Sequence, residues 1–209
     1  MTLAEPQALY ERALAGGRMR VRLDGGLTFP LDVDRWLGPV TEADQAVLDR
    51  AVGPVLDVVC GRGRHVGALA ARGVHALGID ALPAAVRLAR ARHGATALEA
   101  SIFGHIPAAG AWNCALLLDG NIGIEGDPIR LLRRVRELLA HGGRVLTEVA
   151  RPGRATRIVH MRLEDDDDHS VAFPWALVGL DGLPAISRAA GLRLQATWSH
   201  SGRWFAELA

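Results

Sequence analysis

Lysine is absent from this sequence, and all 24 basic residues are arginine. Because 23 acidic residues balance them, the formal net charge is only +1. The composition therefore gives no reason to expect nucleic acid or an anionic membrane as a partner. Without lysine, no glycine-rich loop of this chain can be the P-loop that cradles a nucleoside triphosphate.

Cysteine is also scarce, since Cys60 and Cys114 are the two present. Two cysteines do not form a disulfide framework, so a reducing, cytoplasmic location is expected. No run of about 18 apolar residues predicts a transmembrane helix. Residues 1–17 lack a basic start and a continuous apolar core, so no signal peptide is expected.

The length of 209 residues suits one domain with a small additional cap. We expect residues 1–51 to form a helical or irregular N-terminal cap. It contains a helix that follows Pro6, a short strand over 19–23 and a helix capped by Thr41. Residues 29–39 are expected to be irregular. Residues 52–209 are expected to form a single globular unit.

From Val55 onward, short apolar runs alternate with helical patterns, which indicates a parallel sheet with helices on both faces. The last two strands flank a turn composition and are expected to form an antiparallel hairpin. The predicted strands cover residues 55–59, 74–79, 96–100, 113–119, 144–150, 192–198 and 203–208. The predicted helices between them cover 64–72, 83–92, 128–139 and 181–191.

Distinctive residues follow the first four of these strands. Because ligands bind at the carboxyl ends of parallel strands, these residues are expected to meet around one ligand. They are Asp57 and Cys60–Gly63 in the first strand and its loop, Asp80 after the second, Ser101 and Ile102 after the third, and Asp119 with Asn121 after the fourth.

The glycine loop and Asp80 fit two kinds of ligand. Gly61 and Gly63 allow close backbone approach, and Asp80 offers acceptors to a ribose diol. A dinucleotide and S-adenosylmethionine both meet these requirements. The dinucleotide fingerprint, however, needs glycine where Val66 stands. Asp57 would also repel a pyrophosphate but suits the ammonium of an amino-acid ligand.

The stretch VLDVVCGRGRH…GID, from Val55 to Asp80, resembles the first two motifs of class I S-adenosylmethionine-dependent methyltransferases. The resemblance extends over residues 52–149 and to the closing hairpin. It implies a Rossmann-like fold with a mostly parallel seven-stranded sheet, and a methyltransferase activity. Because the core has no large inserted recognition domain, a small molecule is expected as the methyl acceptor rather than a protein or nucleic acid.

Carried over by position, the resemblance implies a cofactor site and a cytoplasmic enzyme. Cys60, Gly61 and Gly63 would line the methionine part, with Asp57 nearby. Asp80 would bind the ribose, and Asp119 with Asn121 would close the site beside the sulfonium. The residues implied beside the adenine are Ala81, Leu82, Ser101 and Ile102.

Val59 departs from the family pattern, because a glycine normally occupies this position. A β-branched residue disfavours positive φ and would cost about 1–3 kcal/mol in a strained position. Three outcomes stay open: the loop adjusts, the cofactor binds weakly, or the fold serves as a non-catalytic binding module. A nicotinamide-dependent reductase is a further, disfavoured alternative.

The remaining site candidates are expectations about the acceptor side. Trp36 and Trp175 are candidates for the pocket wall, although buried packing explains both equally well. Asp119 or a histidine is a candidate base. The acidic run Asp165–Asp168 with His169 is expected to be solvated, so no metal site is predicted.

Overall fold

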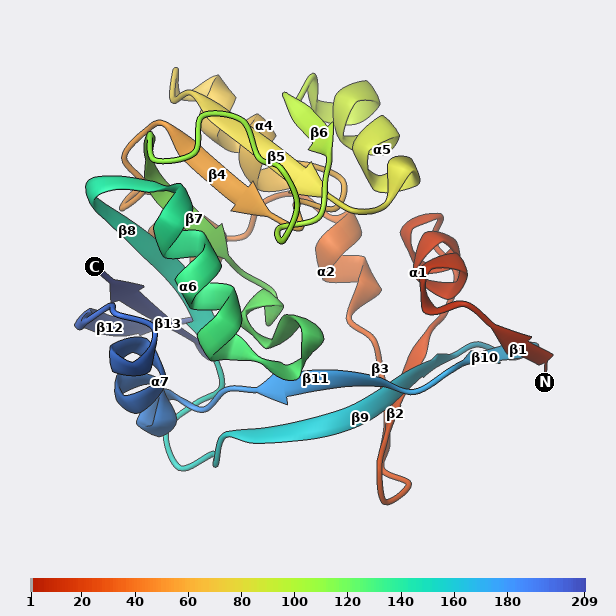
Figure 1. Cartoon of the computed structure of the whole chain (residues 1–209). Coiled ribbons are helices and arrows are strands. Elements are labelled where there is room, and N and C mark those ends of the chain that lie inside the picture. The colour runs from red at the N-terminus through yellow and green to blue at the C-terminus, as the bar shows by residue number, and fades with distance from the viewer. Residues whose placement is uncertain (1) are drawn as a thin grey trace.

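The chain folds around a seven-stranded sheet (Figure 1). The computed structural model describes residues 2–209, without the side chain of His93. The strand order is β12 (Leu194–His200), β13 (Arg203–Leu208), β8 (Leu139–Val149), β7 (Trp112–Leu117), β4 (Val55–Val58), β5 (Ala76–Asp80) and β6 (Ala97–Glu99).

Five strands of this sheet, β8, β7, β4, β5 and β6, are parallel to one another. Strand β13 pairs antiparallel to β8, and β12 completes the terminal hairpin. The predicted fold class, mostly parallel with an antiparallel hairpin at the end, is confirmed. Because the five parallel strands lie side by side, the loops that follow β4, β5 and β7 open at one edge of the sheet.

Helices cover both faces of the sheet, and the strands are buried between them. Successive side chains point to opposite faces, so Val55 and Leu56 belong to different hydrophobic cores. One core contains residues of α3 (Glu42–Leu48), α4 (Arg64–Ala71) and α5 (Pro83–His93). The other contains residues of α6 (Pro128–Leu138) and α7 (Leu183–Ala189).

Helix ends follow the expected local chemistry in most places. The Thr41 hydroxyl accepts from the Asp44 amide, while the Asp44 carboxylate accepts from the Thr41 amide, which forms a capping box. Proline opens α1 (Pro6–Leu14), α5 and α6. Strand β8 starts at Leu139, five residues earlier than predicted, because Leu139 pairs with Trp112.

A second, six-stranded sheet combines strands from residues 2–30 with strands from residues 157–177. Strands β1 (Thr2–Ala4), β10 (Asp168–Ser170), β9 (Arg157–Glu164), β2 (Arg20–Leu23) and β3 (Thr28–Pro30) follow in this order, and β11 (Phe173–Leu177) also pairs with β9. The expectation of an irregular segment over 29–39 is wrong. β3 pairs with β2 there, and helix α2 (Val33–Leu37) follows.

The second sheet is amphipathic. Val21 and Leu163 are paired and buried on one face, whereas Arg22 and Glu164 form an ion pair of 2.7 Å on the other. Helix α1 packs against β9 and β10 and also contacts α5. Figure 1 shows α1 and α2 between the second sheet and the main sheet. The short 3-10 helices η1 (Asn121–Gly126) and η2 (Leu180–Gly182) complete the described elements. None of the described helices is long and apolar enough to cross a membrane.

Candidate active site

The loop that follows β4 begins with a left-handed turn at a valine. Val59 adopts a φ of 58°, a left-handed conformation that glycine tolerates and a β-branched residue disfavours. The Asn121 side chain donates to the carbonyl oxygens of Val58, at 3.0 Å, and Val59, at 3.3 Å. Asn121 therefore holds the strained turn in place from the loop after β7.

The two loop glycines have different roles. A Cβ added at Gly61 would meet nothing within 4 Å, so the space beside this residue is open. A Cβ at Gly63 would lie 2.8 Å from the Ala89 Cβ and 3.0 Å from the Ala95 Cβ. Gly63 thus allows the start of α4 to pack against α5 and the segment before β6, and it does not line the cavity described below.

Asp80 connects the loops after β4 and β5. Its carboxylate accepts from the Gly61 amide at 3.0 Å and from the Leu82 amide at 2.9 Å. Burial raises the pKa of Asp80, while these two backbone donors lower it. Asp80 is 2% exposed, yet it lines a cavity, so its remaining acceptor capacity faces that cavity.

A cavity of about 460 Å³ lies where the carboxyl ends of β4, β5 and β7 meet the apolar face of the second sheet. Its volume is in the range typical of small-molecule sites. Ser101 and Ile102 do not line it, because Ser101 is exposed and Ile102 packs in a core. The predicted cofactor residues that do line it are Asp57, Val59, Cys60, Gly61, Asp80, Ala81, Leu82, Asp119 and Asn121.

Aromatic side chains form much of the opposite wall. Trp36 and Trp175, both considered from the sequence, line the cavity together with Tyr10, Phe29 and Phe173. Tyr10 meets Trp36 edge to face, with 5.9 Å between ring centroids. Sequence reasoning missed the last three residues. The alternation of apolar and polar residues in β2 and β9 was the available signal for this wall.

An ionic network that the sequence did not reveal lies beside the cavity and includes two of its lining residues, Arg64 and Asp119. Arg64 contacts Asp44 and lies 2.8 Å from Asp119. Arg203 lies 2.7 Å from both Asp44 and Glu148. These contacts tie α3, α4, the loop after β7, β8 and β13 together.

Asp119 was a candidate base, but the cations of the network lower its pKa. Burial alone would raise the pKa of Asp119, but Arg64, His65 and Arg35 hold that pKa below its usual value. Arg35 lies 3.2 Å from the same carboxylate. A carboxylate held ionised by arginines is a weak proton acceptor, so Asp119 is poorly suited to act as a base.

His65 is not a suitable base either. Its Nε2 lies 3.5 Å from Asp44 and its Nδ1 lies 3.6 Å from Asp57. Burial lowers the pKa of His65, but the two carboxylates outweigh burial and raise the pKa to about 9. His65 is therefore an imidazolium at neutral pH.

Residues 55–143 match the family model described as "Methyltransferase domain". This part of the chain is similar to methyltransferase domains. The matched range begins with β4 and includes the glycine loop, Asp80 and Asp119. The match agrees with the family resemblance that the sequence motifs indicate.

Solved structures agree with this assignment at the level of the fold. A SAM-dependent methyltransferase from Bacteroides fragilis, in complex with S-adenosyl-L-homocysteine, aligns over 100% of this chain and 97% of its own, with a TM-score of 0.83 and 20% identity. The 1,6-didemethyltoxoflavin-N1-methyltransferase of Burkholderia thailandensis aligns over 100% of this chain and 91% of its own. The TM-score is 0.66 and the sequence identity is 15%. The CcbJ methyltransferase of Streptomyces caelestis aligns over 83% of this chain and 91% of its own, with a TM-score of 0.63 and a sequence identity of 16%. No curated protein sequence matches the chain.

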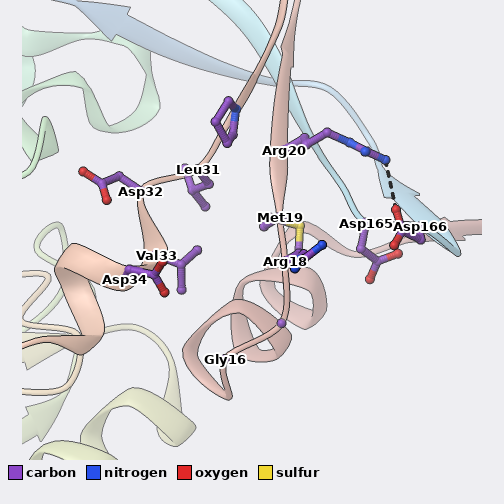
Figure 2. Close-up of a pocket in the computed structure, with 12 residues that line it drawn as sticks. Gly16, Arg18, Met19, Arg20, Leu31, Asp32, Val33, Asp34, Asp165 and Asp166 are labelled. Carbon is purple, nitrogen blue, oxygen red and sulfur yellow. Dashed lines mark hydrogen bonds and ion pairs between the residues drawn. The ribbon is translucent and has the colours of Figure 1, made fainter.

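A second cavity of the protein, of about 580 Å³, lies away from the strand ends (Figure 2). It is bounded by the turn after α1, by β3 and by Asp165 and Asp166, and Arg20 crosses to Asp166 at 3.2 Å. None of the predicted site residues lines this cavity. We therefore assign the active site to the smaller cavity.

The acidic run beside this second cavity forms part of the fold. Arg12 lies 2.9 Å from Asp165 and 2.7 Å from Asp168, and Asp165 also accepts from the amides of Asp167 and Asp168. Among the described residues, no group of three or more His, Cys, Asp or Glu side chains is arranged to hold a metal ion. The run therefore connects α1 to the turn between β9 and β10.

The ionic network predicts how stability depends on pH. The folded-state pKa of His65 is raised, so its contribution is complete below about pH 6.5 and is lost as the pH rises toward 9. The folded-state pKa of Asp44 is lowered, chiefly by His65, Thr41 and Arg203 against the effect of burial. Its contribution is complete above about pH 4 and is lost below it.

We therefore expect the free energy of unfolding, measured by urea titration, to be highest between about pH 4 and 6.5 and to fall from pH 6.5 to 9. His65→Gln should remove the alkaline fall, whereas His141→Gln, at an exposed position, should keep it. An alkaline fall that persists in His65→Gln would contradict the assignment.

Proposed function

We propose that this methyltransferase transfers a methyl group from S-adenosylmethionine to a small molecule. One observation carries the proposal: Asp57, Asp80 and Gly61 line the same cavity as the aromatic wall of the second sheet. The similar structure from Bacteroides fragilis holds S-adenosyl-L-homocysteine, the product left when S-adenosylmethionine loses its methyl group, which supports the cofactor.

The residues of the cavity suit this cofactor. Asp57 lines the cavity and brings a carboxylate that suits an ammonium group, although its buried Oδ2 lies 3.6 Å from His65 Nδ1. The open space beside Gly61 admits a ligand close to the backbone. Asp80 offers acceptors to two hydroxyls. Together these groups match an amino acid joined to a ribose.

The shape of the site supports a small acceptor. The cavity is bounded by α1, α2 and four strands of the second sheet, so its acceptor side is walled by the chain itself. In this proposal, residues 52–209 bind the cofactor. Residues 1–51, together with strands from 157–177, cover the acceptor. The 1,6-didemethyltoxoflavin-N1-methyltransferase is a similar structure crystallised with its small-molecule substrate.

Methyl transfer from this cofactor requires mainly that the side chains orient the two reactants. S-adenosylmethionine supplies an electrophilic methyl group on a sulfonium. Asp80 and the loop that contains Gly61 orient the cofactor, and the aromatic wall positions the acceptor and excludes water. We propose that alignment and desolvation, rather than proton transfer, account for most of the rate.

Calorimetric titration with S-adenosylmethionine and S-adenosylhomocysteine tests the proposal. The wild type is expected to bind both. Val59→Gly should bind about 10-fold more tightly, because Val59 lines the cavity and removal of its side chain relieves overpacking against the ligand, which is worth about 1–3 kcal/mol.

Val52→Gly is the matched control, since Val52 is exposed and precedes β4, and its affinity should equal that of the wild type. If neither the wild type nor Val59→Gly binds either nucleoside, the proposed function is wrong and a non-catalytic binding role becomes the better explanation.

A further inference from the structure

The chain concentrates its aromatic residues on this one cavity. Five of its ten Trp, Tyr and Phe residues line it. The strands of the second sheet add only apolar side chains to this wall, because alternation turns Arg22 and Arg162 to the opposite face, where both pair with Glu164. A wall of this composition favours a flat, uncharged molecule.

The acceptor side of the cavity offers no proton acceptor. Tyr10 is the titratable residue contributed by α1, α2 and the second sheet. Burial, followed by the charges of Asp80 and Asp119, raises the pKa of Tyr10 well above its usual value. Its hydroxyl therefore stays protonated and can donate but not act as a base at neutral pH.

The cofactor side of the cavity offers none either. Asp119 is held ionised by arginines and His65 is an imidazolium, as described above. Burial raises the pKa of Cys60 far above neutrality. The remaining acceptors of Asp80 are assigned to the ribose in the proposed function, and Asp57 faces His65, so neither carboxylate is directed at the acceptor. Arg62 and Arg64 complete the titratable residues of the cavity, and guanidinium groups do not accept protons.

We infer that the acceptor is a planar, largely apolar heterocycle whose nucleophile is a ring nitrogen that is unprotonated at neutral pH. This inference rests on the proposed function. An alcohol or a phenol needs a base to become a strong nucleophile, whereas the nitrogen lone pair of an azine is available without one. An anionic acceptor would find no cation on the wall of the second sheet.

The transfer balances without a proton. The nitrogen lone pair forms a bond to the methyl carbon, the carbon–sulfur bond breaks, and its electron pair stays on sulfur. The positive charge passes from sulfur to nitrogen. Rings such as Trp36 and Trp175 are suited to this step, because an aromatic face stabilises a cation that moves across it.

The experiment compares acceptors of matched shape. Isoquinoline and quinoline are the azine probes, and 2-naphthol and 1-naphthol are the hydroxyl probes. Transfer of the methyl group from labelled S-adenosylmethionine is followed at pH 7. At least one azine should be methylated with a kcat/KM at least 10-fold above that of either naphthol. Trp175→Ala should raise the KM for that azine at least 10-fold, with little change in S-adenosylmethionine affinity.

Trp198→Ala is the matched control, because Trp198 packs against Phe205 and Arg50 outside the cavity, and it should leave the KM unchanged. Trp175→Phe should keep most of the affinity for the azine. Equal or faster methylation of a naphthol would overturn the inference, as would no transfer to either azine by protein that binds S-adenosylmethionine. Absence of S-adenosylmethionine binding would instead overturn the proposed function.

Discussion

Asp80→Ala is expected to weaken S-adenosylmethionine binding by about 100- to 10,000-fold. A hydrogen bond to a charged group contributes about 1.5–3 kcal/mol, and Asp80 is proposed to accept two from the ribose. The substitution also removes the acceptor that joins the Gly61 and Leu82 amides, so the loops after β4 and β5 lose their shared contact. Calorimetric titration measures the affinity.

Two further variants make this result specific. Asp80→Asn keeps one oxygen acceptor and should lose less affinity than the alanine variant. Glu137→Gln changes an exposed carboxylate of α6, 62% exposed, and should bind like the wild type. Unchanged affinity in Asp80→Ala, with a wild-type melting temperature, would show that Asp80 is not the ribose ligand.

Asp44→Ala is expected to lower the free energy of unfolding by about 3–5 kcal/mol, the usual cost of leaving one partner of a buried ion pair alone. Asp44 is 0% exposed and contacts Arg64, Arg203 and His65. Its removal leaves these cations buried without compensation and breaks the capping box of α3. Urea denaturation gives the free energy, with linear extrapolation to water.

A matched control lies at the other end of the same helix. Asp49 is 68% exposed and pairs with Arg72 at 2.9 Å, and Asp49→Ala should cost less than about 1 kcal/mol, as surface pairs do. Similar losses in the two variants would mean that the buried network adds nothing beyond ordinary ion pairs.

The main sheet could be predicted because its information is local. Each strand is a short apolar run, each helix shows its own start or stop, and short alternating units permit few topologies. The convergence of Asp57, Asp80 and Asp119 followed from the same rule, because parallel strands open their carboxyl ends at one edge.

The second sheet was harder to predict because its pairs are distant in sequence. Val21 pairs with Leu163, which is distant in the sequence. The short strand β3 is defined by its pairing with β2. The alternation in these strands was visible, but alternation does not name a partner strand. The aromatic wall depended on this pairing, so Tyr10, Phe29 and Phe173 were missed.

The roles of individual residues needed packing information as well. Gly63 matched the motif, but only the nearby Ala89 and Ala95 show that it serves helix packing. Asp119 matched a catalytic position, and only Arg64, Arg35 and Arg203, from three separate elements, show that it is a paired anion.

The sequence by itself determined the parallel sheet, the glycine loop and the order of carboxylates along the strand ends, because hydrophobic period and turn chemistry act over a few residues. Only the tertiary structure decided which carboxylates are paired, how Asn121 holds Val59 in a left-handed turn, and what faces the cofactor. Those properties depend on burial and on charges brought together from distant segments, which local patterns do not encode.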